Sequence, residues 1–226
     1  MRHMTDLTLY ITWKNYSSWS LRAWLLMRAL EIPFEEILVP MTETAALPGM
    51  AGISPTRKVP CLIDRSMSGG MAGVTIWETM AIAEYLDELF PDAGVWPEDM
   101  ASRATARALV SEIHAGFTAL RGECPMNLRR VPAPLAVSDA CRADVARVGA
   151  IFADCLDASG GPFLMGRFSA VDAFYAPVLS RIMTYQLLDS DAVRGFATAL
   201  DSLPAWQEWR GAALAETAVI PADEVG

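Results

Sequence analysis

Basic residues, histidines and cysteines are all scarce in this chain. Lys and Arg number 18 against 27 Asp and Glu, and the formal net charge of −9 argues against a nucleic-acid partner. Arg129 and Arg130 form a basic pair that is too short to be a binding arm. The histidines are His3 and His114, and no two cysteines form a CxxC pair, so we expect no metal site. We interpret the cysteines as reduced, packed thiols: Cys61, Cys124, Cys141 and Cys155.

Long apolar runs are absent as well. No stretch reaches the roughly 20 apolar residues that a membrane-spanning helix needs. The first residues lack the apolar segment of a secretory signal. A hydrophobic fraction of 53% with 20% charged residues is typical of a well-buried core and not of disorder. We therefore expect a cytoplasmic protein without a membrane partner.

Strand and helix patterns alternate up to Pro91. Apolar spacing predicts helices over residues 20–30 and 78–90, and Pro91 ends the second. A glycine-rich loop at 66–73, longer than a hairpin needs, separates the last two predicted strands. The order β-α-β, a long connection and then β-β-α indicates a mixed α/β layer fold. The predicted strands are Leu7–Ile11, Phe34–Val39, Cys61–Asp64 and Val74–Trp77.

Helical patterns replace strand patterns after Pro91. One apolar stripe at helical spacing runs from Ala106 to Leu120 and another from Cys141 to Cys155. Ser169-Ala170-Val171-Asp172 resembles a capping box, with Asp in place of the usual Glu or Gln. A last helix opens at Ser202-Leu203-Pro204. The second part of the chain is therefore predicted to be all-helical.

These patterns divide the chain into two domains. We expect a thioredoxin-like α/β domain over residues 5–92 and a linker over 93–98. An all-helical domain follows over 99–220.

The first segment that could carry chemistry lies where the first strand leads into the first helix. Ser17 and Ser18 stand at this helix N-terminus, where free backbone N–H groups and the helix dipole favour an anion. The same environment would stabilise the thiolate of a bound thiol. The alternative is that either serine only caps the helix.

The second segment precedes the third predicted strand. Val59-Pro60 could hold a cis peptide bond, which would leave the Val59 backbone free to pair with an extended peptide ligand. A trans proline that merely starts the strand is the alternative.

The third segment starts the helix at 78–90. Thr79 can offer its hydroxyl and its backbone N–H to a carboxylate, and Glu78 can pair with an ammonium group. An amino-acid head group carries both charges. An ordinary acidic helix start is the alternative.

Together and in this order, the segments resemble the cytosolic glutathione transferase family, in its serine-type bacterial branch near the zeta, or maleylacetoacetate isomerase, class. Residues 17–22, Ser-Ser-Trp-Ser-Leu-Arg, resemble the zeta motif SSCSxR, with Trp19 where that class has cysteine. Val59-Pro60 matches the cis-proline position of the family, and Glu78-Thr79 matches its Glu-Ser pair. Residues 168–174 resemble the family's capping box in the second domain.

The resemblance implies a thioredoxin-like domain joined to an all-α domain in a homodimer. It implies a detoxification enzyme that joins glutathione, a co-substrate, to a small hydrophobic electrophile, with no metal. Ser17 is the implied catalytic residue, because its hydroxyl would hold the glutathione thiolate. The implied glutathione-binding residues are Ser18, Lys58, Val59, Pro60, Glu78 and Thr79.

Other hydroxyls compete with Ser17 for the thiol. A slip of one residue in the alignment would exchange it with Ser18, and Ser20 is a further candidate. Tyr16 and Tyr10 are minor candidates: tyrosine-type members of the family carry the activating phenol on the first strand, where Tyr10 lies and Tyr16 does not.

Two other functions stay open. One is the glutathione-dependent isomerisation of a diacid like maleylacetoacetate, which Arg121 or Arg129 could serve by binding its carboxylates. The other is a non-catalytic, transferase-like binding protein. We interpret His114 as a packed or solvated residue and not as a base.

Overall fold

A four-stranded sheet forms the first layer of the protein. The computed structural model describes residues 6–67 and 73–225. The strand order is β2-β1-β3-β4, with β1 parallel to β2 and antiparallel to β3, and β3 antiparallel to β4. All four predicted strands are confirmed, although the second is shorter than expected at both ends. The strands are β1 (Leu7–Ile11), β2 (Glu35–Leu38), β3 (Cys61–Asp64) and β4 (Val74–Trp77).

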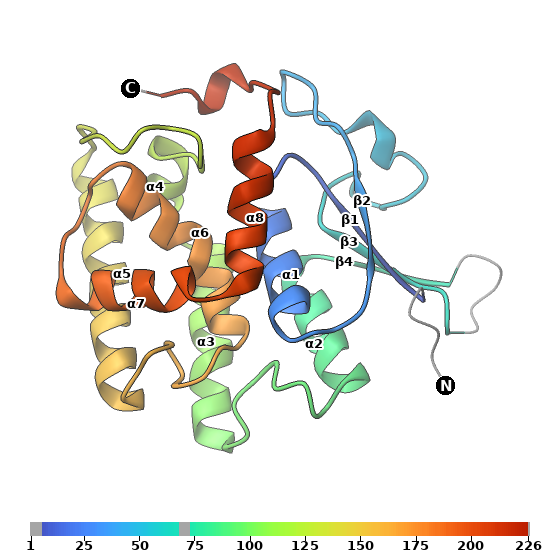
Figure 1. The fold of residues 1–226 in the computed structure, drawn as a ribbon, viewed down its shortest axis with the longest axis horizontal. Helices are drawn as coiled ribbons and strands as arrows, with labels where there is room; N and C mark the ends of the chain where they lie inside the picture. Colours follow the sequence, from blue (N-terminus) through green and yellow to red (C-terminus); the bar gives the residue numbers. More distant parts are fainter. Residues whose placement is uncertain (1–5, 68–72, 226) are drawn as a thin grey trace.

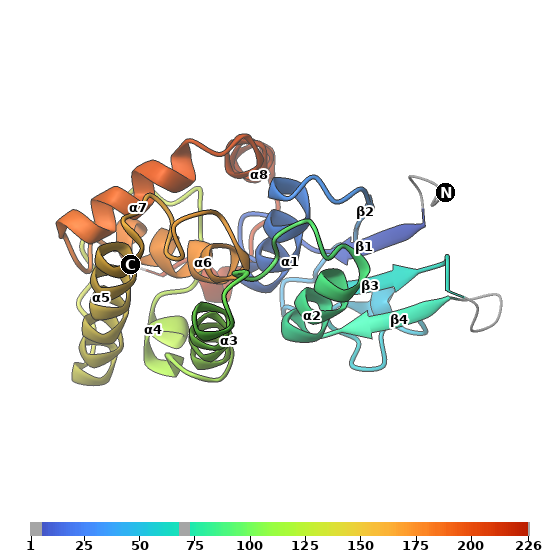
Figure 2. The ribbon, with the colours of Figure 1, turned by 90° about the horizontal axis from the view of Figure 1, so that it is seen from below.

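Helices α1 (Ser18–Ala29) and α2 (Thr79–Leu89) lie on one face of the sheet, between it and the helical part of the chain (Figure 2). The short 3-10 helix η1 (Pro48–Met50) belongs to the long connection between β2 and β3. This arrangement confirms the predicted thioredoxin-like layer.

The helices that follow form a bundle beside this layer (Figure 1). Their N-caps explain several of the starts: the hydroxyl of Ser138 accepts a hydrogen bond from the Cys141 N–H at 3.1 Å, for example. The elements are α3 (Met100–Ala115), α4 (Thr118–Glu123), α5 (Asp139–Ser159), α6 (Ala170–Thr184), α7 (Asp191–Asp201), α8 (Pro204–Ala215) and the 3-10 helix η2 (Pro221–Asp223).

The sequence predicts a single helix over the apolar stripe from Ala106 to Leu120. The structure divides this stripe between two helices, α3 and α4. The chain breaks between α3 and α4, where Phe117 adopts a left-handed backbone with φ 53°. The turn buries the Phe117 side chain, which is 7% exposed, and redirects α4 toward α5. Helix α7 is a further element that was not among the predicted helices.

The capping box at Ser169 is confirmed. The Ser169 N–H donates to Asp172 Oδ2 at 2.9 Å, and the Ser169 hydroxyl accepts a hydrogen bond from the start of α6. Asp172 Oδ1 also accepts from the Leu164 N–H at 2.8 Å, which ties the preceding loop to the helix. Helix α6 is buried over almost all of its length, so this cap starts the central helix of the bundle.

Helix α1 joins the sheet layer to the bundle. The rings of Trp24 in α1 and Trp209 in α8 lie 5.1 Å apart, and Arg22 donates to the Phe174 carbonyl of α6 at 3.3 Å. Lys14, just before α1, pairs with Glu36 at 2.8 Å. Helix α1 and the residue segment before it are thus held from both layers.

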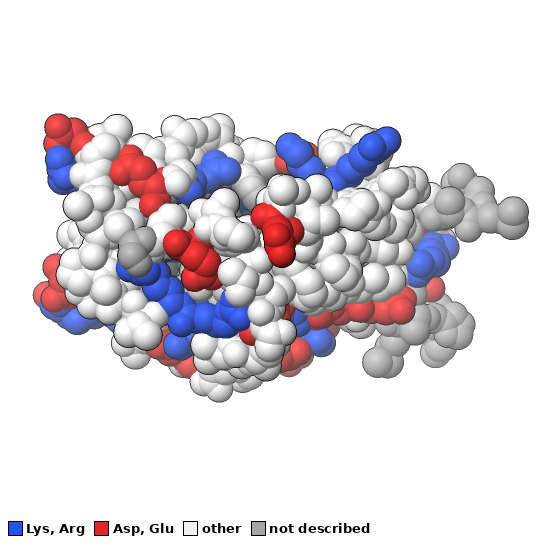
Figure 3. Space-filling view, turned by 90° about the horizontal axis from the view of Figure 1, so that it is seen from above, with Lys and Arg blue, Asp and Glu red and all other residues white. Residues whose placement is uncertain are grey.

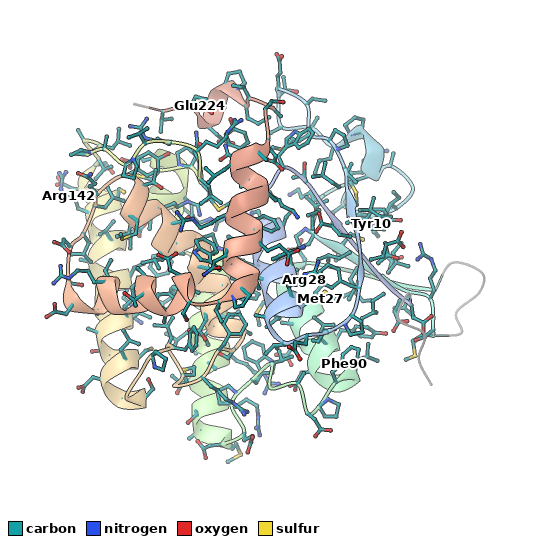
Figure 4. All side chains as sticks on the ribbon, viewed as in Figure 1. Tyr10, Met27, Arg28, Phe90, Arg142 and Glu224 are labelled. Atoms are coloured by element: carbon teal, nitrogen blue, oxygen red, sulfur yellow. The ribbon has the colours of Figure 1, made fainter. Side chains whose placement is uncertain are left out.

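The segment after α8 returns to the turn between β1 and α1. The Glu216 carboxylate accepts hydrogen bonds from the backbone N–H groups of Lys14, at 2.7 Å, and Asn15, at 3.0 Å. The Tyr16 hydroxyl contacts Glu224, which Figure 4 labels near η2, and accepts from Arg129 at 2.7 Å. We call residues 216–224 the C-terminal strap.

No described helix is long and apolar enough to cross a bilayer. The face drawn in Figure 3 carries both acidic and basic side chains, and its basic side chains form only a short band. Most of the predicted glycine-rich loop at 66–73 lies outside the described residues.

Candidate functional site

A cavity of about 250 Å³ lies where the sheet layer meets the bundle. It brings together five of the sequence-predicted residues, although they come from two separate segments of the first domain. The Val59-Pro60 peptide bond is cis. The lining residues are Trp19, Thr56, Lys58, Val59, Pro60, Glu78, Thr79, His114 and Arg121.

A larger cavity of about 700 Å³ opens between α3 and α5. None of the residues predicted from the sequence to carry chemistry lines it, so we place the site in the smaller cavity.

Glu78 and Thr79 stand at the N-terminus of α2. The exposed Glu78 has a φ of 69°, a backbone conformation that residues other than glycine rarely adopt. Thr79 is buried, and its hydroxyl lies 3.4 Å from His114 Nδ1. The helix N-terminus thus presents free N–H groups, a hydroxyl and a carboxylate close together, a set that suits a zwitterionic head group.

The serines of the first segment lie outside the lining of this cavity. Ser17 is the N-cap of α1: it accepts from the Ser20 N–H at 3.2 Å and donates to the Ser20 hydroxyl at 2.8 Å. Ser20 in turn accepts from the Thr12 N–H at 3.1 Å. Ser18 is buried and accepts from Arg181 of α6 at 3.3 Å. Ser17, which is only half-buried, is therefore the most accessible of the three hydroxyls.

The other candidate activators are engaged elsewhere. Burial raises the pKa of Tyr16, and its hydroxyl belongs to the contacts with the C-terminal strap. Tyr10 packs in a small apolar cluster with Val39 and Cys61. Burial also raises the pKa of the Cys61 thiol to about 11, so this cysteine is a packed strand residue, as predicted.

Trp19, His114 and Arg121 complete the cavity from α1, α3 and α4. The prediction that His114 is only packed or solvated missed its place here. No helical spacing in the sequence reveals this place, because His114 and Arg121 lie on separate helices, α3 and α4, and meet through the turn at Phe117. The described residues contain no cluster of metal-ligating side chains.

Comparison with known proteins supports the resemblance. Residues 16–89 match the family model described as "Glutathione S-transferase, N-terminal domain". A glutathione transferase homologue from Burkholderia, solved with bound glutathione, superposes with a TM-score of 0.67 over 92% of this chain and 97% of its own, at 22% sequence identity. Residues 16–89 thus resemble the N-terminal domain of glutathione transferases, and the superposition over most of the chain shows the glutathione transferase fold.

Further proteins are similar to this chain in fold or in part of its sequence. A homologue from Sulfitobacter with bound glutathione has a TM-score of 0.65 and 17% identity, over 92% of this chain and 98% of its own. A Caenorhabditis elegans protein named "Probable maleylacetoacetate isomerase" is 31% identical over 112 residues, 50% of this chain and 48% of that protein. The chain thus spans about half the length of the curated relatives that it matches.

Proposed function

We propose that this protein is an enzyme that joins the sulfur of glutathione to small hydrophobic electrophiles. The observation that carries the proposal is the cavity in which the cis Val59-Pro60 segment meets the Glu78-Thr79 helix start. Two structural relatives hold glutathione. In this proposal a domain over residues 5–92 binds glutathione, and a helical domain over 99–220, joined to it by residues 93–98, binds the electrophile. The protein would act in detoxification in the cytoplasm.

Glutathione would lie along the cavity as an extended peptide. Glu78 would pair with the γ-glutamyl ammonium group, and Thr79 with the N-terminus of α2 would bind the γ-glutamyl α-carboxylate. The Val59 backbone beside Pro60 would pair with the cysteinyl residue, as a strand does. We place Lys58 and Ser18 at the borders of this site.

Ser17 would act on the sulfur. A thiol has a pKa of about 8.5, and each pKa unit corresponds to about 1.4 kcal/mol. One hydrogen bond to a charged group contributes about 1.5–3 kcal/mol, enough to hold the thiolate at neutral pH beside the N-terminus of α1. The hydroxyl would turn from Ser20 to the sulfur to make this bond.

Ser17→Ala tests this role. We expect the pKa of bound glutathione to rise by about one to two units, and turnover at pH 7 to fall by about ten- to a hundredfold. Ultraviolet absorbance of the bound thiolate against pH measures the shift, with Ser18→Ala as the matched control.

A rise in the pKa of bound glutathione in the Ser18→Ala variant alone would mean that Ser18, and not Ser17, holds the thiolate. A wild-type protein without bound thiolate near pH 7 would favour the non-catalytic, transferase-like binding protein.

Glutathione-dependent isomerisation is the second candidate. The name of the C. elegans relative favours it, as does the guanidinium group of Arg121 in the cavity. An assay with maleylacetoacetate separates the two: an isomerase forms the trans isomer without consuming glutathione, whereas a transferase consumes one glutathione for each product.

A further inference from the structure

Three arginines gather beside the candidate site, where α1, α4 and α6 meet. Arg22 and Arg181 are buried, and Arg121 is half-buried. Within residues 6–67 and 73–225, none of them forms an ion pair with a carboxylate. Nη1 of Arg22 is buried without a hydrogen-bond partner in the same part of the chain. Because buried cations without counter-ions are costly, an anion bound next to them would be stabilised.

Arg121 is the arginine of this cluster that reaches the cavity. Its Nη1 donates to the carbonyls of His114, at 3.5 Å, and Gly116, at 3.3 Å, and so closes the C-terminal end of α3. Its Nε and Nη2 have no hydrogen-bond partner among the described residues. The guanidinium carbons of Arg121 and Arg22 lie 4.8 Å and 4.0 Å from the ring centroid of Trp19, so Arg121 lines the cavity while Arg22 packs against a wall residue from outside the lining.

His114 connects this cluster to the start of α2. Its Nδ1 lies 3.4 Å from Thr79 Oγ1, and its Nε2 lies 3.7 Å from Glu78 Oε2. Burial lowers the pKa of His114; Glu78 raises it, while Arg22 and Arg121 lower it further. These groups together favour the neutral imidazole in the free protein, and a carboxylate bound beside it would favour its protonation.

We propose that Arg121 and His114 act with Thr79 and the N-terminus of α2 to hold the α-carboxylate of the γ-glutamyl residue of glutathione. The assignment rests on the proposed function, since it names residues for that same ligand. The head group is the part of glutathione that carries an ammonium group and a carboxylate on one carbon, and here Glu78 and the Arg121–His114 pair offer the two complementary charges side by side. The planar guanidinium group matches a carboxylate, and Arg22 adds positive potential behind Trp19.

Calorimetric titration with two ligands tests the assignment. One is glutathione, and the other is γ-aminobutyryl-cysteinyl-glycine, which differs only in lacking the α-carboxylate. The proteins are wild type, Arg121→Gln and the control Arg147→Gln, which removes an exposed arginine paired with Glu112 on α3. We expect Arg121→Gln to weaken glutathione binding by about ten- to a hundredfold and to leave binding of the analogue unchanged. The control variant should bind both ligands as wild type does.

Three results would overturn the assignment. They are an equal loss of affinity for both ligands, an unchanged affinity for glutathione, and an effect confined to the KM of a carboxylate-bearing electrophile. The last result would mean that Arg121 binds the second substrate and not glutathione. A wild-type protein that binds neither ligand would instead overturn the proposed function, and the assignment with it.

A second measurement needs no change at Arg121. The chain has only two histidines, His3 and His114, so imidazole NMR signals are readily assigned with a His114→Gln variant. S-methylglutathione, which has no thiol to titrate, should raise the pKa of His114. The S-methylated analogue without the α-carboxylate brings only its ammonium group to Glu78 and should not raise that pKa. Equal shifts with both ligands, or no shift with either, would contradict the assignment.

Discussion

At the scale of single residues, the backbone of Glu78 is strained at the start of α2. Its φ of 69° and ψ of 129° are conformations that cost a residue with a Cβ about 1–3 kcal/mol. We predict that the free energy of unfolding of the Glu78→Gly variant is about 1 kcal/mol higher than that of the Glu78→Ala variant. Both variants lose the carboxylate, but only glycine relieves the backbone strain. Urea denaturation measures the difference. An alanine variant of equal or greater stability would contradict this explanation.

Short-range residue patterns named one side of the candidate cavity directly, and from the other side they named Arg121 only as a possible ligand of a diacid. Val59-Pro60 and Glu78-Thr79 are each local segments, so the sequence shows their chemistry directly, and the cavity contains both. His114 and Arg121 reach it only because the chain turns at Phe117 and Arg121 folds back onto the end of α3. No pattern of neighbouring residues encodes that turn. The roles of Ser17, Ser18 and Lys58 stay predictions.

At the scale of elements, the cap of α6 holds the centre of the bundle. We predict that Asp172→Ala lowers the free energy of unfolding by about 2–3 kcal/mol, because the buried N–H groups of Leu164 and Ser169 lose their acceptor. Thermal or urea unfolding checks the prediction. The matched control is Asp191→Ala, which removes an exposed aspartate from the first turn of α7 and should cost less than about 0.5 kcal/mol. Equal effects of the two substitutions would contradict the assigned role of Asp172.

Most elements followed from apolar periodicity and caps, as the strand bounds and the Ser169 capping box show. The exceptions have a physical cause. The stripe from Ala106 to Leu120 keeps helical spacing across Gly116, so periodicity alone cannot reveal the break. Helix α7 differs, because its sequence does carry a helix signal: Ser190 caps it, and the buried Val193, Phe196 and Leu200 recur at helical spacing.

At the scale of the whole molecule, the C-terminal strap holds the turn that carries Ser17. We predict that Glu216→Ala lowers the free energy of unfolding by about 1–3 kcal/mol, since the N–H groups of Lys14 and Asn15 lose their acceptor. The pKa of bound glutathione should rise as well, because the loosened turn positions Ser17 less well. Ultraviolet titration and urea unfolding measure the two effects.

Glu208→Ala is the control for the strap, because Glu208 makes an exposed ion pair with Arg28 on the neighbouring surface. It should change neither quantity appreciably. If it matches Glu216→Ala, or if the thiol pKa stays constant in both, the strap does not position the turn.

We also predict a homodimer. The family resemblance implies it, and Val74 and Trp77 on the edge strand β4 are large apolar side chains that solvent reaches in the single chain. Light scattering at micromolar concentrations should give twice the mass of the chain. A measured mass equal to that of a single chain throughout that concentration range would contradict the prediction.

The strap also sets an order of events during synthesis. Lys14 and Asn15 leave the ribosome about 200 residues before Glu216, and at about 5–20 residues per second that interval lasts roughly 10–40 s. During this time the sheet and the helix start at Glu78 can form, but the turn beside Ser17 lacks its clamp. We expect copies truncated before residue 216 to bind glutathione through the Glu78 end and to activate it poorly. Such incomplete copies would sequester the tripeptide without turning it over.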